Sequence, residues 1–179
     1  MTLLTTDRLT LSPVAPADFD DLCALFGDME FTRHIMGRAL NEEEVWSRLL
    51  RDLGHWQVLG YGNWTIRSRA DGTYVGQVGV LDYRRHIDPP LDAPELGWGL
   101  ATAHQGHGYA LEALSAVLGW ADAQLTAART VCMIAPDNAP SQTLAARAGY
   151  RAYAQTDYAG GPVILLERPR RKPPTVAGH

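Results

Sequence analysis

The chain has 179 residues, a length that fits one domain with a single hydrophobic core. Hydrophobic residues make up 46% of it and charged residues 20%, a balance that excludes a wholly disordered protein. No apolar run approaches the roughly 18–20 residues of a membrane span, and the N-terminus lacks the basic start and apolar core of a signal peptide. Two cysteines cannot build a disulfide framework, so we expect a soluble, cytoplasmic protein.

The net charge of −4 is unevenly distributed along the chain. Residues 168–179 hold four basic residues and no acid, which leaves residues 1–167 with 12 basic and 20 acidic residues. Such an acidic body disfavours nucleic acid and favours a cationic amine as partner. Because residues 168–179 also hold three prolines and no apolar period, we predict a domain over 1–167 and a flexible basic tail over 168–179.

In the first half of the chain, alternation of apolar and polar residues predicts a strand over Arg8–Val14. Spacing of three and four residues predicts a helix over Pro16–Gly27. A second helix is expected after Asn41, an N-cap residue followed by three glutamates that suit the helix dipole. Residues 63–84 contain two β-rich runs joined at Asp71–Gly72, which predicts a hairpin.

In the second half, a polar loop over residues 84–93 precedes alternating strands and helices. The predicted order is strand Pro94–Leu100, helix Gly108–Leu125, strand Thr130–Ile134, helix Ala139–Ala148, and strands around Arg151–Thr156 and Val163–Glu167. A strand, a helix and a strand in succession form a βαβ unit with parallel strands. We therefore predict one α/β (α+β) domain with a mixed sheet flanked by helices.

The stretch from Glu95 to Ala110 is the most informative for chemistry. Glu95, Gly97 and Gly99 share one face of the predicted strand, where glycines often mark close approach by a ligand or another backbone. The turn that follows exposes backbone N–H groups at the positive end of a helix, which suits a pyrophosphate. Taken alone, this turn equally fits a connection that binds nothing.

Gln105-x-x-Gly108-x-Ala110 matches the acyl-CoA signature Gln/Arg-x-x-Gly-x-Gly/Ala of the Gcn5-related N-acetyltransferases (GNAT). Asn138-x-x-Ser141, followed by Gly149-Tyr150, resembles a second element of that superfamily. Upstream, residues 6–13, 64–66 and 75–80 resemble the RimJ/RimL-like branch, which includes ribosomal-protein N-terminal acetyltransferases. The resemblance spans roughly residues 4–166 with its elements in the right order.

The resemblance implies a mostly antiparallel sheet whose central parallel strand pair splays around the pantetheine of acetyl-CoA. It also implies three sets of cofactor-binding residues: Trp98, Gly99 and Leu100 for pantetheine, Gln105, Gly106, His107, Gly108, Tyr109 and Ala110 for pyrophosphate, and Asn138 and Ser141 near the thioester. Asn138 also fits a helix N-cap, and the two roles can coexist. His104 and His107 have ligand-like spacing, but they fall inside this turn, so we predict no metal.

Two residues are candidates for catalysis. Many GNAT members carry a tyrosine four residues after the Ser141 position, which acts as the acid toward the leaving thiolate. This chain has Ala145 at that position. Since a thiol of pKa near ~8.5 is already a fair leaving group, Ser141 is the best replacement donor. Glu95 is the candidate base, acting directly or through one water. The alternatives are a structural Glu95 and deprotonation without any single essential base.

The resemblance places the segment around His34 beside the acceptor. The candidate acceptor-pocket residues are Phe31, His34, Met36 and Trp64, although each also fits core packing or loop anchoring. We predict an acetyl-CoA-dependent N-acetyltransferase that acts on a protein or peptide N-terminus or a cationic small-molecule amine by direct attack. The alternatives are a non-catalytic acyl-CoA sensor and an interaction module that uses the basic tail. A homodimer is compatible with the resemblance.

Overall fold

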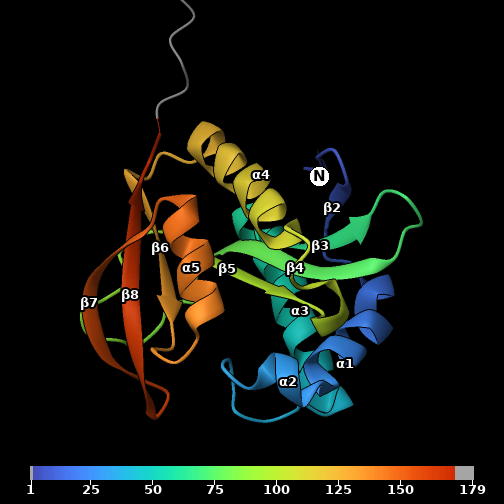
Figure 1. The fold of residues 1–179 in the computed structure, drawn as a ribbon, viewed down its shortest axis with the longest axis horizontal. Coiled ribbons are helices and arrows are strands. Elements are labelled where there is room, and N and C mark those ends of the chain that lie inside the picture. The colour runs from blue at the N-terminus through green and yellow to red at the C-terminus, as the bar shows by residue number, and fades with distance from the viewer. Residues whose placement is uncertain (1, 172–179) are drawn as a thin grey trace, which may run out of the picture.

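A computed structural model describes residues 2–171, which fold around one eight-stranded sheet (Figure 1). The strands are β1 (Leu4–Thr5), β2 (Leu9–Pro13), β3 (Asn63–Ser68), β4 (Tyr74–Leu81), β5 (Glu95–Leu100), β6 (Arg129–Ile134), β7 (Arg151–Tyr158) and β8 (Gly161–Pro169). Their order in the sheet is β1-β2-β3-β4-β5-β6-β8-β7. All neighbours run antiparallel except β5 and β6, which run parallel. This confirms the predicted fold class.

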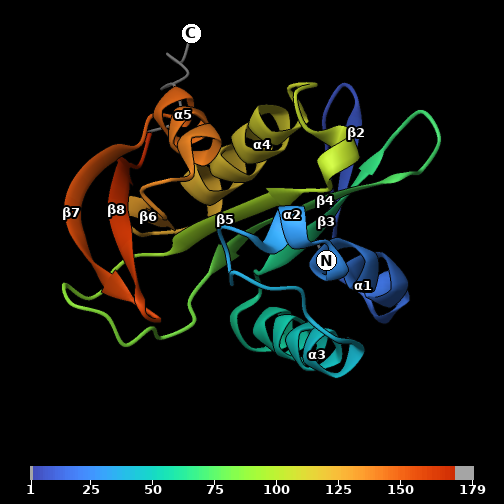
Figure 2. The ribbon, with the colours of Figure 1, turned by 60° about the horizontal axis from the view of Figure 1, so that its bottom comes forward.

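Helices cover both faces of the sheet. They are α1 (Phe19–Gly27), α2 (Met29–Thr32), α3 (Glu42–Leu59), α4 (Tyr109–Gln124) and α5 (Ala139–Ala148), with short 3-10 turns η1 (Pro16–Asp18) and η2 (Thr102–His104). Figure 2 shows α4 and α5 on one side of the sheet and α1, α2 and α3 on the other. Within residues 2–171, no helix has both the length and the apolar character to cross a bilayer.

The alternation of β5 divides its side chains between these two layers. Leu96 and Leu100 are buried in the core with Leu114 of α4. Gly99 lies on the opposite face, where an added Cβ would come within 2.6 Å of the Phe31 ring on α2. The face that carries Glu95 and the glycines therefore looks toward the α1–α3 layer, as the alternation predicts.

Capping residues fix where the functional helices begin. Asn41 Oδ1 accepts a hydrogen bond from the Glu44 N–H at 3.0 Å, and Glu44 Oε2 accepts one from the Asn41 N–H at 3.0 Å, which closes a capping box. Asn138 Oδ1 accepts from the Ser141 N–H at 3.2 Å and caps α5. These starts confirm the predictions, whereas the four-residue α2 is too short to show a periodic pattern.

The C-terminal end corrects the predicted domain boundary at residue 167. β8 continues to Pro169, and Arg168 is only 4% exposed. Its guanidinium donates to both carboxylate oxygens of Asp122 on α4, at 2.9 and 2.7 Å. Residues 168–171 thus belong to the folded domain. The sequence does not reveal this, because an arginine that forms a buried ion pair looks there like any other member of a basic cluster. The remaining predicted tail, residues 172–179, lies outside the described residues.

Candidate active site

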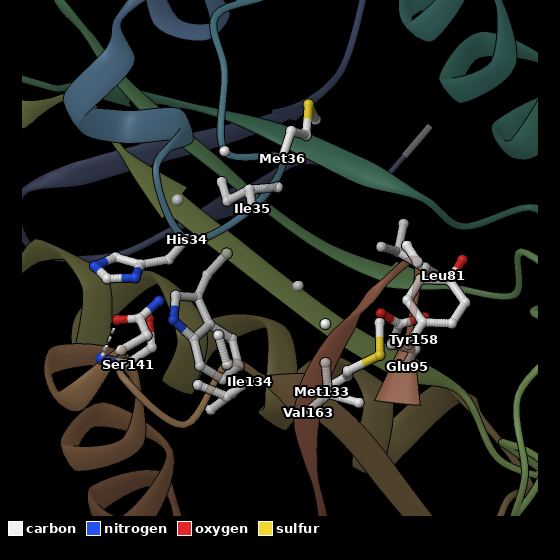
Figure 3. Close-up of a pocket in the computed structure, with 18 of the residues that line it drawn as sticks. His34, Ile35, Met36, Leu81, Glu95, Met133, Ile134, Ser141, Tyr158 and Val163 are labelled. Atoms are coloured by element: carbon white, nitrogen blue, oxygen red, sulfur yellow. Dashed lines mark hydrogen bonds between the residues drawn. The ribbon is translucent and has the colours of Figure 1, made fainter. Parts of the chain in front are cut away.

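The main cavity has a volume of about 710 Å³ and lies where β5 and β6 diverge. Its walls come from the α1–α3 face of β4 and β5, the segment between α2 and α3, helix α3, the start of α5 and the β7–β8 turn. This volume falls within the roughly 300–1,000 Å³ typical of small-molecule sites. Figure 3 shows the segment of His34, Ile35 and Met36 facing the strands across it.

The parallel strands β5 and β6 separate almost at once. Their register contains one pair, Glu95 with Val131, and one further backbone bond joins the Val131 N–H to the Pro94 carbonyl at 3.0 Å. On its other edge β5 pairs with β4 along its whole length. Within residues 2–171, the β6-facing backbone groups of Trp98–Leu100 therefore have no partner strand. An extended ligand with amide groups can pair with such an open strand edge.

The turn after β5 has the form expected for an anion site. Gly106 and Gly108 adopt φ angles of 78° and 80°, a left-handed conformation that favours glycine. The turn leads directly into α4, whose first N–H groups and positive dipole end suit a phosphate. The predicted residues from Gln105 to Ala110 form this turn. The side-chain amide of Gln105 donates a hydrogen bond to the Leu100 carbonyl at 3.2 Å.

Arg8 braces this turn, a contact that the sequence analysis missed. It donates from Nη1 to the His107 carbonyl at 3.0 Å, and its guanidinium lies 4.5 Å from the centre of the Tyr109 ring. Its backbone N–H and Nε donate to Glu112 on α4 at 3.0 and 2.7 Å. Burial raises the pKa of Glu112, but hydrogen bonds from Thr6 and Arg8 outweigh it, so the pKa falls below its ordinary value. Arg8 and Glu112 are 104 positions apart, beyond any local pattern.

Glu95 is buried and fully paired. Its Oε2 and Oε1 accept hydrogen bonds from Arg85 Nε at 2.6 Å and Nη2 at 2.9 Å. Arg85 Nη1 also donates to the Tyr158 hydroxyl at 3.0 Å, and Figure 3 shows Glu95 beside Tyr158. Burial lowers the pKa of Arg85, but the hydrogen bonds and charge of Glu95 raise it by more, so the pKa lies above its ordinary value. A carboxylate held bidentately by arginine fits the structural alternative better than a free base.

Ser141 and Asn138 line the same cavity at its other end. In Figure 3, Ser141 lies next to His34, well away from Glu95. The His34 Nδ1 atom is 3.3 Å from Asp137 Oδ1 but makes no hydrogen bond within residues 2–171. Ala145, at the position where many GNAT members carry tyrosine, is completely buried in the core. Ser141 is thus the hydroxyl that α5 brings to the cavity.

Three of the four candidate acceptor residues line the cavity, namely Phe31, His34 and Met36. The prediction for Trp64 is wrong: this side chain is 0% exposed and lies in the core. Its ring centre is 5.1 Å from that of Trp120 on α4, on the opposite side of the sheet. A bulky aromatic residue in a strand fits either face, and only the sheet register shows which face it occupies.

The charges around the cavity differ from those of the whole chain. Its lining contains five arginines and one carboxylate: Arg33, Arg38, Arg48, Arg51, Arg85 and Glu95. The sequence analysis missed the arginines because a net charge of −4 says nothing about where each charge lies. They come from the α2–α3 segment, α3 and the loop after β4, which are distant in sequence.

Three comparisons with known proteins agree with this geometry. Residues 8–151 match the family model of the acetyltransferase (GNAT) domain. A GnaT-family acetyltransferase structure from Bordetella pertussis has a TM-score of 0.84 at 36% identity, covering 94% of this chain and 99% of that chain. The uncharacterised N-acetyltransferase p20 of Bacillus licheniformis is 25% identical over 142 residues, which cover 79% of this chain and 78% of p20.

A ribosomal-protein acetyltransferase has the same fold. The structure of RimL, the ribosomal L7/L12 α-N-protein acetyltransferase, in complex with coenzyme A has a TM-score of 0.78 at 17% identity. The match covers 94% of this chain and 98% of RimL. The TM-score establishes a shared fold, and an identity this low leaves the acceptor open.

Proposed function

The chain belongs to the GNAT acetyltransferase family and is an acyltransferase, and on that premise we propose that it transfers an acetyl group from acetyl-CoA to a primary amine. The observation that carries this proposal is the divergence of β5 from β6 after the single pair Glu95–Val131. It leaves an open strand edge beside a cavity and a glycine turn at the start of α4, which together suit pantetheine and pyrophosphate.

The pantetheine arm and the pyrophosphate of acetyl-CoA each have a counterpart in this proposal. Backbone groups of Trp98–Leu100 pair with the pantetheine arm, and the amides of Gln105–Ala110 hold the pyrophosphate. Asn138 binds the pantetheine near the thioester while it also caps α5. Arg8 acts as a positioning residue, since it fixes the turn through the His107 carbonyl.

The proposed reaction is direct attack within a ternary complex. The neutral amine nitrogen bonds to the thioester carbonyl carbon, the carbon–sulfur bond breaks, and CoA leaves as a thiolate that Ser141 assists by donating a hydrogen bond. The amine proton passes to solvent, while Glu95 holds Arg85 in place. Orientation and polarisation of the carbonyl by strand N–H groups supply most of the acceleration. Burial raises the pKa of Cys132, as expected of an inert thiol rather than a nucleophile.

The acceptor classes proposed from the sequence are a protein or peptide N-terminus and a cationic small-molecule amine. An α-amino group has a pKa near ~8, so a useful fraction is neutral at pH 7, whereas a lysine amine near ~10.4 needs more help. The proposal includes a cytoplasmic location, where thiols such as Cys23 and Cys132 stay reduced.

Calorimetry with acetyl-CoA and with free CoA tests the cofactor, and thiol release with a panel of peptides and amines tests the transfer. We expect micromolar binding and thiol release that depends on the amine. Binding without release for any amine would support the sensor alternative. Absence of binding would refute the whole assignment, because each role above depends on acetyl-CoA.

A further inference from the structure

The cavity carries a local excess of positive charge. Three of its five arginines have carboxylate partners: Arg38 with Glu44, Arg51 with Asp52 at 3.3 Å, and Arg85 with Glu95 at 2.6 Å. The other two, Arg33 and Arg48, have no ion pair within residues 2–171. Arg33 is exposed, so Arg48 is the cation of interest inside the cavity.

Arg48 projects from α3, and its guanidinium lies 4.3 Å from the centre of the Phe26 ring. Its Nε is buried and has no hydrogen-bond partner among the described residues. Burial lowers the pKa of Arg48; Asp52 and Tyr83 oppose this shift, and Arg51 and Arg85 add to it. An arginine nonetheless stays protonated at neutral pH. Arg48 is partly buried, and a cation withdrawn from water without a hydrogen-bonded counter-ion is costly, so an anionic ligand would relieve that cost.

Gln77 presents a second donor to the same cavity. It lies on β4 opposite Gly99 of β5 and is only 6% exposed. Its Nε2 atom is also buried without a hydrogen-bond partner in residues 2–171. Arg48 and Gln77 come from different elements, yet both side chains line one cavity, and each has a donor without a partner among the described residues. Carboxylate and phosphate oxygens accept bonds from both types of donor, and those from arginine are charge-assisted.

We propose that the acceptor is a small amine that also carries an anionic oxygen group, a carboxylate or a phosphate, which Arg48 and Gln77 bind. This inference rests on the proposed function, since it defines the class of its acceptor. The CoA pyrophosphate is a poor explanation for these donors, because the turn over Gln105–Ala110 does not line the cavity. A polyamine is disfavoured because it would bring further positive charge to a cavity that already holds two arginines without an ion pair among the described residues.

The test compares matched pairs of amines with the wild-type protein and acetyl-CoA. One set pairs free amino acids with their C-terminal amides, and another pairs phosphoethanolamine with ethanolamine. Spermidine and peptide amides with a free N-terminus complete the panel. We expect kcat/KM to be at least about tenfold higher for the anionic member of a pair. The carboxylate of a free amino acid makes the neighbouring amine more basic, so a smaller fraction of that amine is neutral at pH 7. Intrinsic reactivity therefore favours the amino-acid amide, and a preference for the free amino acid must come from the protein.

The variant Arg48→Met should raise KM for the anionic amine by about 10- to 100-fold, the value of one charge-assisted bond, and leave that of its neutral partner nearly unchanged. Gln77→Met should act in the same direction and more weakly. Arg151→Met is the matched control, because Arg151 is exposed and lies outside the cavity lining. The affinity for acetyl-CoA, measured by calorimetry, should be the same in all three variants.

Two results overturn the inference and leave the proposed function intact. One is thiol release that favours the amides, spermidine or the peptide amides over the small anionic amines. The other is an equal loss on both members of each pair in Arg48→Met, which indicates a structural role for that arginine. Absence of thiol release with every amine refutes both proposals. The pairwise comparison needs only the wild-type protein, so it remains decisive if a variant fails to fold.

Discussion

At the scale of single residues, the chemistry of Glu95 depends on its partner. The sequence places this carboxylate on the glycine face of β5, and the structure confirms that placement. The sequence does not reveal Arg85, which lies ten positions earlier and binds both carboxylate oxygens. Alternation along a strand predicts which face a side chain occupies, whereas the hydrogen-bond partner of Glu95 depends on how the loop before β5 folds back.

The variant Glu95→Gln separates a base from a positioning group. The amide keeps one acceptor for Arg85, so we expect kcat to fall by less than about tenfold and its pH profile to keep its shape. Loss of a general base, in contrast, typically lowers the rate by about 10²–10⁴-fold. Steady-state kinetics between pH 6 and 9 would show the difference. A large loss of kcat together with a lost ascending limb would restore Glu95 as the base. Arg85→Met is the companion variant, and it should reproduce the defect if positioning is the role.

Gly99 provides a second test at this scale. In Gly99→Ala, the new Cβ would lie 2.6 Å from two carbons of the Phe31 ring, closer than atoms can pack, so the ring or β5 must move. We expect a loss of about 1–3 kcal/mol of unfolding free energy and a higher KM for acetyl-CoA. Urea denaturation and kinetics measure both effects. Adding Phe31→Leu should recover much of the stability, and a double variant no better than the single one would contradict the steric cause.

At the scale of elements, signals within a few residues of one another predict well. The hairpin at Asp71–Gly72, the start of α3 after Asn41 and the bounds of α5 all agree with the structure. The sequence analysis missed the four-residue α2, because a helix of about one turn is too short to show a periodic pattern between its N-cap Asp28 and its C-cap Arg33. Trp64 was misplaced for a different reason: its local pattern fits a strand on either face, and register is a property of neighbouring strands.

The capping box of α3 makes a direct prediction. Asn41→Ala removes the acceptor for the Glu44 N–H, so the unfolding free energy should fall by about 1 kcal/mol. Urea denaturation of the whole chain measures this loss. Asn41→Ser is the matched control, since serine caps about as well as asparagine and should stay close to wild type. Equal losses in both variants would show that the side chain of Asn41 contributes packing rather than a cap.

At the scale of the whole molecule, the distribution of charge matters more than its sum. The net charge of −4 suggests a cationic partner, yet the cavity is lined by five arginines and one carboxylate. The arginines lie on segments that approach one another only in the folded chain, so no sequence window reveals them together. The glycine turn before α4 is visible in the sequence, because a signature of six adjacent residues is local.

The same limit applies to Arg168, which the sequence assigned to a tail and the structure pairs with Asp122. Burial raises the pKa of Asp122, but the hydrogen bond and charge of Arg168 outweigh it, so the pKa lies below its ordinary value. A carboxyl group with a lowered folded-state pKa stabilises the fold above its unfolded pKa of about 3.9. That contribution is lost as the pH falls through the folded-state pKa.

Asp122→Asn should therefore destabilise the protein at pH 7 by about 3 kcal/mol, since it leaves the buried Arg168 without its counter-ion. The difference from wild type should shrink as the pH falls from about 4 through the lowered folded-state pKa of Asp122, where the wild-type carboxyl also becomes protonated. Urea denaturation at a series of pH values measures this. Asp157→Asn, an exposed site on β7, should stay within about 0.5 kcal/mol of wild type at each pH. A loss in Asp122→Asn that does not change with pH would mean that packing, rather than charge, holds β8 against α4.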